Sequence, residues 1–199
     1  MKKKFLSKSL KLIVNNKPNM TEEELATIKY GLESMYINIS KIIIIVLLAT
    51  TLNLLIPTLL VMLAYNIIRS TSFGLHATKS IYCLISSILL FIGGAYICLN
   101  LTIPIYIETI ICILCFICIY LYAPADTQNR PLINIKKRKR YKTISIISVV
   151  LYTIIILIDN SIISNYLLIG LVEASILIHP LVYKIFNLPF DNYKNYQYN

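Results

Sequence analysis

Long runs of apolar residues, separated by short polar stretches, fill the chain from residue 39 to residue 183. The clearest runs cover residues 81–99, 109–122, 143–158 and 161–183. Their lengths approach the roughly 20 residues with which a helix crosses the bilayer core. Apolar residues make up 57% of the chain, whereas about 45–50% is usual for a soluble domain. The pattern therefore predicts an all-α integral membrane protein.

The first apolar run, residues 42–65, allows two interpretations. It is long enough for one tilted span, but the polar Asn53 near its centre also allows a hairpin of two short helices. Lysines near the N-terminus place that end in the cytoplasm, and Arg69 and Lys79 place the polar stretch after the run on the same side. Two crossings return the chain to that side. We therefore expect six transmembrane helices, the first two of them short, with both termini cytoplasmic.

The two ends of the chain differ from this central domain, which we assign to residues 39–185. Residues 1–38 mix apolar residues with lysines, which predicts amphipathic helices lying on the cytoplasmic face of the membrane. Thr21 and Glu24 have the spacing of a capping box, which marks the start of the second of these helices. Residues 186–199 are polar and rich in Tyr and Asn, and we expect a disordered tail.

The net charge of +10 is concentrated at membrane boundaries, near the N-terminus and in residues 136–142. Such clusters suit the anionic lipids on the cytoplasmic side of a plasma membrane. We expect no nucleic-acid partner, because both clusters flank spans. We also expect no cleaved signal peptide, because Lys8 and Lys11 interrupt the first apolar residues and no small-residue cleavage site follows.

One polar stretch, residues 69–83, carries side chains suited to catalysis. It contains His76, one of two histidines in the chain, and Cys83 seven residues later. Cysteine attacks as a thiolate, which a nearby base or a helix N-terminus stabilises. Ser80 is a plausible cap of the next span, which would put Cys83 in its first turn, and Lys79 adds positive charge. Spacing alone leaves two interpretations: a cysteine–histidine active site at a membrane face, or a boundary histidine and thiol without a catalytic role.

The other candidate groups predict no cofactor. Cys112, Cys115 and Cys118 repeat every three residues, but only Glu108 lies near enough to complete a metal site. Packing of small apolar side chains is therefore favoured over a metal. We expect no disulfide framework and, without a phosphate-binding loop or metal-ligand spacing, no cofactor. Glu173 lies inside the last apolar run, where an acid usually marks function or a buried partner.

Three motifs follow one another along the chain: Arg69 with Gly74-Leu75-His76-Ala77 and Cys83, then Tyr122-Ala123-Pro124-Ala125 with Pro131 and the basic run 136–142, then Gly170 with Glu173-Ala174. Their order and spacing resemble those of the accessory gene regulator B (AgrB-like) family. These are membrane cysteine peptidases that process the precursors of cyclic signalling peptides in Gram-positive bacteria. The resemblance covers nearly the whole chain.

The resemblance implies that Cys83 is the nucleophile and His76 the general base, with Arg69 and Gly74 as supporting residues. The implied activity is that of a thiol protease, a hydrolase of quorum sensing. It cleaves the C-terminal part of the precursor, holds the rest as an acyl-thioester on Cys83, and promotes peptide cyclisation to a thiolactone or lactone autoinducing peptide. Asp126 is a candidate to orient His76, although a solvated turn residue is the favoured interpretation.

The implied partner is an AgrD-like precursor with an amphipathic leader and an acidic C-terminal segment. Lys79, Arg130 and the basic run 136–142 suit the acidic segment. The turn after the second motif contains Gln128 and Asn129 where some family members have lysines, which departs from their pattern. Glu173 is a candidate either for substrate binding or for helix packing. The sequence leaves open whether the working unit is a homodimer.

Two alternatives from other functional classes remain. A small polytopic transporter or exporter without peptidase activity would explain the spans and Glu173, but not the polar stretch with Arg69, His76 and Cys83. A membrane anchor or sensor partner would need only the basic loop. Replacing Cys83 separates these classes, because only a peptidase should lose its function.

Overall fold

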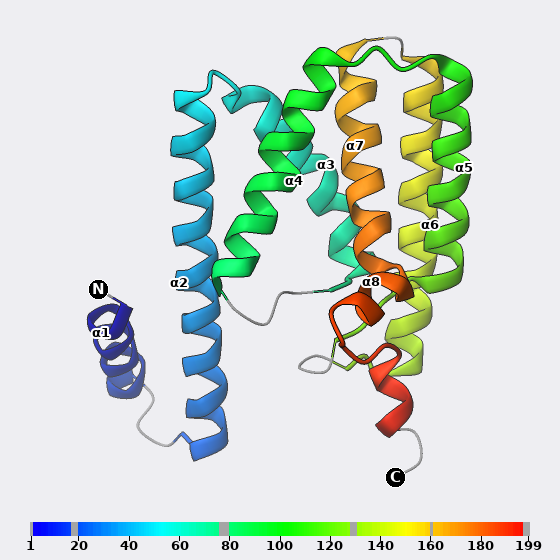
Figure 1. Ribbon diagram of the computed structural model, residues 1–199. Helices are drawn as coiled ribbons and strands as arrows, with labels where there is room; N and C mark the ends of the chain where they lie inside the picture. The colour runs from blue at the N-terminus through cyan, green and yellow to red at the C-terminus, as the bar shows by residue number, and fades with distance from the viewer. Residues whose placement is uncertain (1, 17–19, 76–79, 128–130, 160, 197–199) are drawn as a thin grey trace. The chain divides into compact units, whose positions relative to one another are not determined.

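The computed structural model describes residues 2–16, 20–75, 80–127, 131–159 and 161–196. The described residues form helices joined by short connections (Figure 1). In chain order, the helices are α1 (Lys2–Asn16), α2 (Glu22–Thr51), α3 (Leu55–Ser72), α4 (Ser80–Asn100), α5 (Ile105–Tyr122), α6 (Ile135–Ile158), α7 (Ile162–Ile178), α8 (Pro180–Ile185) and the 3-10 helix η1 (Asn192–Tyr196). The chain divides into two compact units, Met1–Thr51 and Leu52–Asn199.

In the first unit, α1 packs against α2. The rings of Phe5 and Tyr36 lie 5.4 Å apart, and Leu6 is buried. The predicted capping box is present: the Thr21 amide donates to Glu24 Oε2 at 3.0 Å, and the Glu24 amide donates to Thr21 Oγ1 at 3.2 Å. Reciprocal bonds of this kind satisfy amide groups that have no partner inside the helix, so α2 begins where the sequence predicts.

The first turn between predicted spans lies where expected, but the helix before it is longer than predicted. Asn53 adopts a φ of 56° between α2 and α3, which places the predicted turn. The sequence predicted an amphipathic helix followed by a short span, whereas α2 continues for 30 residues from Glu22 to Thr51. The physical reason is that no proline interrupts this stretch, so nothing breaks the hydrogen-bond ladder.

Among the described residues, five helices are long and apolar enough to cross a membrane: Glu24–Thr51, Leu55–Ser72, Ile81–Asn100, Ile105–Tyr122 and Ile135–Ile158. A sixth, α7, is apolar but shorter, with 17 residues. The chain is therefore an all-α, multi-pass membrane protein, as predicted. The last predicted span is divided in two, because α7 ends before His179 and Pro180 opens the separate helix α8.

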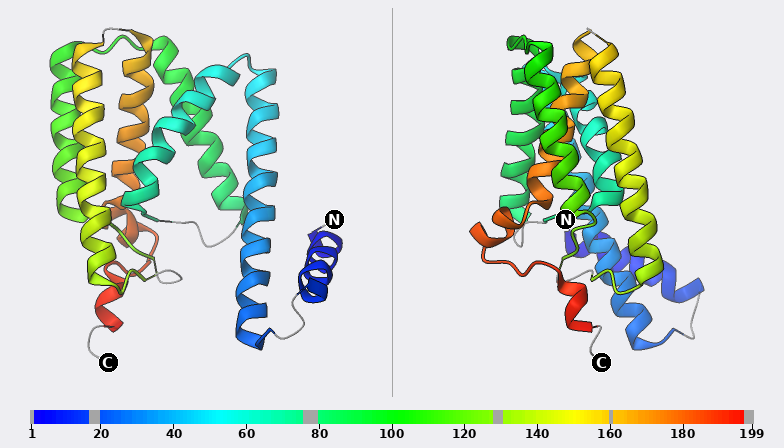
Figure 2. Two further views of the ribbon diagram at one scale, coloured as in Figure 1. Left: turned by 180° about the vertical axis from the view of Figure 1, so that it is seen from behind. Right: turned by 90° about the vertical axis from the view of Figure 1, so that its right-hand side faces the viewer.

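The second unit is built around α7, which packs against α3, α4, α5 and α6. Figure 2 shows α3 and α4 on one side of α7 and α5 and α6 on the other. Gly170 permits a close approach of α7 to α3, because a Cβ atom there would lie 2.7 Å from both Ala64 Cβ and the Tyr65 amide nitrogen. From α6, the Tyr152 hydroxyl donates to the Ala64 carbonyl at 3.0 Å. These contacts fix the middle of α3, and the candidate site begins at the end of this helix.

The expectation of a disordered tail is wrong for residues 186–196. Asn192–Tyr196 forms η1, and the Asn192 side chain is 3% exposed. The segment folds back on the bundle because its backbone amides find a buried acceptor there, the carboxylate of Asp126. Polar composition alone predicted disorder because it carries no information about a partner distant in sequence.

Candidate functional site

The first motif begins in the last turn of α3, where Arg69 holds the chain that follows. The Arg69 Nη2 group donates to the Gly74 carbonyl at 3.3 Å and also to the Leu75 carbonyl. Phe73 has a positive φ of 58°, and its amide donates to the Arg69 carbonyl at 3.0 Å. Arg69 therefore closes a tight loop after α3 and fixes the two residues directly before His76.

Gly74 is needed in this loop for its conformation and its small size. Its φ of 109° lies in a region that L side chains rarely adopt. A Cβ atom there would lie 2.9 Å from the Leu177 carbonyl oxygen, 3.1 Å from Ile178 Cγ2 and 3.2 Å from Arg69 Nη1. The loop thus passes directly over the end of α7, and the Leu75 amide donates to the Leu177 carbonyl at 3.0 Å.

The second motif pairs with the first as a short parallel bridge between Phe73 and Ala125. The Gly74 amide donates to the Ala125 carbonyl at 2.8 Å, and the Ala125 amide donates to the Ser72 carbonyl at 2.9 Å. Ala125 is 1% exposed, so these bonds are shielded from water. The end of α3, residues 123–126 and the end of α7 therefore meet at one loop, although they are distant in sequence.

Cys83 lies in the first turn of α4, where the positive end of the helix favours a thiolate. Its side chain is half-buried. His76, Lys79 and Arg130 lie outside the described residues. The pairing of Cys83 with His76 and the substrate-binding roles of Lys79 and Arg130 therefore stay predictions. Of the first motif, the structure describes residues 69–75, which precede His76, and residues 80–83, which follow Lys79.

Tyr65 is a member of this region that the sequence analysis missed. Its buried ring lies 5.2 Å from the Phe91 ring of α4 and 5.4 Å from the guanidinium carbon of Arg69. A Cβ atom at Gly170 of α7 would lie 2.7 Å from the Tyr65 amide nitrogen. The position of Tyr65 four residues before Arg69, on the same helix face, was the available signal. Tyr65 thus connects α3, α4 and α7 above the loop.

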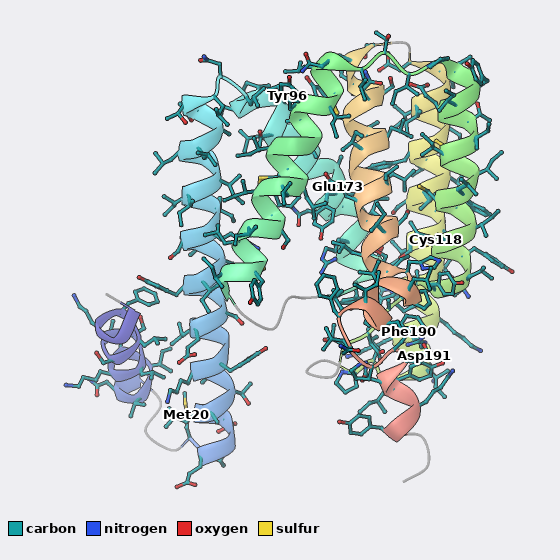
Figure 3. All side chains as sticks on the ribbon, in the orientation of Figure 1. Met20, Tyr96, Cys118, Glu173, Phe190 and Asp191 are labelled. Atoms are coloured by element: carbon teal, nitrogen blue, oxygen red, sulfur yellow. The ribbon has the colours of Figure 1, made fainter. Side chains whose placement is uncertain are left out.

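Glu173 lies in the bundle, on α7 (Figure 3), with a side chain that is 5% exposed. Its Oε2 has no hydrogen-bond partner among the described residues. A Cβ atom at Gly94 of α4 would lie 2.7 Å from Glu173 Oε1, so Gly94 makes room for the carboxyl group. This contact supports the helix-packing alternative for Glu173, and a substrate-binding role stays a prediction.

Asp126 is not a solvated turn residue, as the sequence favoured; it is 2% exposed. Its carboxylate accepts hydrogen bonds from three backbone amides: Leu132 at 3.2 Å, Asn192 at 3.0 Å and Tyr193 at 2.8 Å. The sequence could not reveal this, because two of the three donors come from the C-terminal segment. Asp126 therefore ties that segment to the second motif.

The basic run forms the beginning of α6, where the Asn134 side chain caps the helix by accepting from the Lys137 amide at 3.1 Å. The end of α3, the beginning of α4, the end of α5 and the end of α7 lie at the same end of the second unit (Figure 2). The candidate site is therefore at the basic end of the bundle. Among the described residues, no group of three His, Cys, Asp or Glu side chains is placed to hold a metal ion.

These features define a class: an all-helical, multi-pass membrane protein with a cysteine at a helix N-terminus and a clamped loop, both at its basic end. The sequence model of the family "Accessory gene regulator B" matches residues 6–178. The chain belongs to this family, which gives it a role in the accessory gene regulator system.

Known proteins similar to the chain are named AgrB-like or accessory gene regulator protein B. A protein named AgrB-like from Clostridium acetobutylicum is 31% identical over 193 residues, covering 96% of this chain and 92% of its own length. Another from Listeria innocua is 34% identical over 177 residues, covering 88% and 87%. Accessory gene regulator protein B from Staphylococcus aureus is 32% identical over 165 residues, covering 83% and 88%. No solved structure matches the chain.

Proposed function

We propose that the chain is a membrane-embedded cysteine endopeptidase of quorum sensing. It cleaves an AgrD-like precursor and promotes cyclisation of the product to a thiolactone or lactone. One observation carries the proposal: Arg69, Ala125 and Leu177, from three separate segments, bind the two residues that directly precede His76. Cys83 follows in the first turn of the next helix. A loop fixed this firmly suits a side chain that must meet a nucleophile at hydrogen-bond distance.

The reaction follows from the chemistry of a cysteine–histidine pair. His76 takes the proton from the Cys83 thiol, and the thiolate attacks the carbonyl carbon of the scissile peptide bond. His76 then gives the proton to the leaving amine, the C-terminal piece departs, and an acyl-thioester remains on Cys83. A thiol or hydroxyl within the precursor attacks this thioester, which closes the ring and returns the thiol to Cys83.

The surroundings of the loop suit this chemistry. The partial positive charge at the beginning of α4 favours the thiolate form of Cys83. Residues 136–142, at the basic end of the bundle, attract an acidic segment of a precursor, and we propose the same role for Lys79 and Arg130 from their charge. The apolar spans limit access of water, which would otherwise hydrolyse the thioester before ring closure.

The experiment uses the protein in liposomes with a candidate precursor encoded beside its gene, and mass spectrometry of the products. We compare wild type, Cys83→Ala and the matched variant Cys118→Ala, which removes another half-buried thiol, one bonded to the Ser175 carbonyl at 3.3 Å. The proposal expects a C-terminal fragment with wild type and Cys118→Ala, and none with Cys83→Ala. Cleavage that persists without Cys83 overturns the active site, and cleavage by none of the proteins favours a transporter or anchor.

A further inference from the structure

The C-terminal segment completes the hydrogen bonding of a buried charge next to the candidate site. The Asn192 and Tyr193 amides donate to the two carboxylate oxygens of Asp126, at 3.0 and 2.8 Å. Asp126 and Asn192 are 2% and 3% exposed. A buried carboxylate that loses its donors is strongly disfavoured. The position of Asp126 therefore depends on the segment that follows α8.

Two further clusters hold this segment in place. Phe190, labelled in Figure 3, has its ring 5.1 Å from that of Tyr183 and 6.2 Å from that of Tyr122. Arg138 of α6 lies 3.6 Å from Asp191 and 3.6 Å above the centre of the Tyr193 ring. Aromatic and charged contacts thus bind the segment to α5, α6 and α8. The segment is therefore packed against the bundle.

Hydrogen bonds through residues 125 and 126 connect the docked segment to the loop before His76. Tyr183 donates to the Asp126 carbonyl at 3.3 Å and to the Ala125 carbonyl at 3.5 Å. Ala125 in turn is bonded to Ser72 and Gly74. Residues 123–126 therefore have the C-terminal segment on one side and the first motif on the other. A displacement of Asp126 would therefore also move Ala125, which is bonded directly to Gly74.

We propose that residues 187–196 are a latch that positions residues 73–75, the loop directly before His76. Asp126 is the positioning residue through which the latch acts. The proposal rests on the proposed function, because it assigns the latch to the step in which His76 meets Cys83. The latch lies beyond residue 178, where the match to the family's sequence model ends.

The expected effect is on turnover more than on binding. Without the latch, Asp126 loses two of its three amide donors and residues 123–126 lose support on one side. A displacement of about 1 Å between reacting groups can lower a rate about a hundredfold. We expect kcat to fall by roughly tenfold to a hundredfold, and KM for the precursor to change by less than about threefold, because no precursor-binding group is removed.

The test compares a chain that ends at Phe186 with a control chain that ends at Tyr196, which keeps every latch contact described above. The point variant Asp126→Asn keeps the shape of the side chain but removes its charge and one acceptor, and it serves if the shortened chain fails to fold. Folding is measured by detergent size-exclusion chromatography. Values of kcat and KM come from precursor cleavage in liposomes.

A second readout does not depend on the precursor. The rate at which iodoacetamide alkylates Cys83 is followed by mass spectrometry of the Cys83 peptide, at about pH 7 and at about pH 10, since a free cysteine in solution is ionised at the higher pH. With His76 displaced, we expect alkylation near pH 7 to slow by roughly tenfold while the rate near pH 10 is unchanged. A merely structural role would leave this ratio at the wild-type value in the folded protein.

The outcomes separate the two proposals. Lower kcat with little change in KM, together with slower alkylation near neutral pH, supports the latch. A wild-type kcat and a wild-type alkylation ratio in the shortened chain, or in Asp126→Asn if that chain does not fold, overturn the latch and leave the proposed function standing. If wild type itself never cleaves a precursor, the proposed function fails. The alkylation ratio then still decides whether the segment positions the loop that precedes His76.

Discussion

Arg69 and Leu75 are joined across one tight loop: the guanidinium of Arg69 donates a hydrogen bond to the carbonyl of Leu75, the residue directly before His76. The same nitrogen also donates to the Gly74 carbonyl at 3.3 Å. One side chain from the last turn of α3 thus sets the direction in which the chain enters the loop. This gives the arginine of the first motif a physical role that needs no contact with substrate.

Replacing Arg69 by Lys should therefore lower the cleavage rate. A lysine keeps the charge but lacks the planar fork that reaches two carbonyls at once. We expect kcat to fall about tenfold to a hundredfold, measured by precursor cleavage in liposomes. The matched variant Lys184→Ala removes an exposed basic residue near the same end and should keep wild-type turnover. Equal turnover for Arg69→Lys and wild type would show that the two carbonyl contacts do not position the loop.

Gly74→Ala should destabilise the protein and abolish most of its activity. The new side chain meets the Leu177 carbonyl at 2.9 Å and must adopt a φ of 109°. Such backbone strain costs on the order of 1–3 kcal/mol. Gly93 is the matched control, because a Cβ atom there meets nothing within 4 Å. Thermal unfolding in detergent should show a lower midpoint for Gly74→Ala alone, and two equal midpoints would contradict the loop geometry.

Glu173→Gln distinguishes helix packing from substrate binding. The amide has nearly the shape of the carboxyl group, so the contact with Gly94 is kept while a buried ionisable group is removed. If Glu173 serves packing, stability stays at or above that of wild type and KM for the precursor is unchanged. Gly94→Ala should by contrast destabilise the bundle, because its Cβ would lie 2.7 Å from Glu173 Oε1. A KM raised about tenfold in Glu173→Gln would assign the residue to substrate binding instead.

Ionisation of Tyr183 makes the free energy of unfolding depend on pH in the alkaline range. Burial raises the pKa of its hydroxyl above the ordinary value of 10.0. Below about pH 10 the group is neutral in the folded and the unfolded chain, so its contribution to stability is fully present. Above that pH the unfolded state ionises first, and stability is lost as the pH rises toward the folded pKa. Tyr183→Phe should weaken this alkaline loss and lower stability at neutral pH, where it removes the bonds to Ala125 and Asp126.

Much of the fold could be predicted, because its signals are local. Apolar runs predicted the helices of the bundle, and Asn53 predicted the first turn. The spacing of Thr21 and Glu24 predicted the start of α2. The basic run marked the end of the bundle at which the loop lies. Periodicity did not predict that α2 continues unbroken to Thr51, because a change from amphipathic to apolar composition need not end a helix.

The candidate site was predictable only in part. The motifs drew attention to Arg69 and Gly74, but their contacts with Ala125 and Leu177 depend on chain segments that meet only after folding. Asp126 resembled an ordinary turn residue, since two of its three amide donors lie more than sixty residues further along the chain. Tyr65 was hidden among the apolar residues of α3, although its ring contacts Phe91 of α4 and the guanidinium of Arg69.

The most direct test of the central claim is to find the acyl-enzyme. The protein in liposomes is mixed with precursor, quenched in acid and digested, and the Cys83 peptide is weighed with and without hydroxylamine, which cleaves thioesters. The account predicts a Cys83 peptide heavier by the mass of the precursor lacking its C-terminal piece, and loss of that mass after hydroxylamine. A precursor that is cleaved while Cys83 never carries this mass, or a thioester found on another cysteine, would contradict the account.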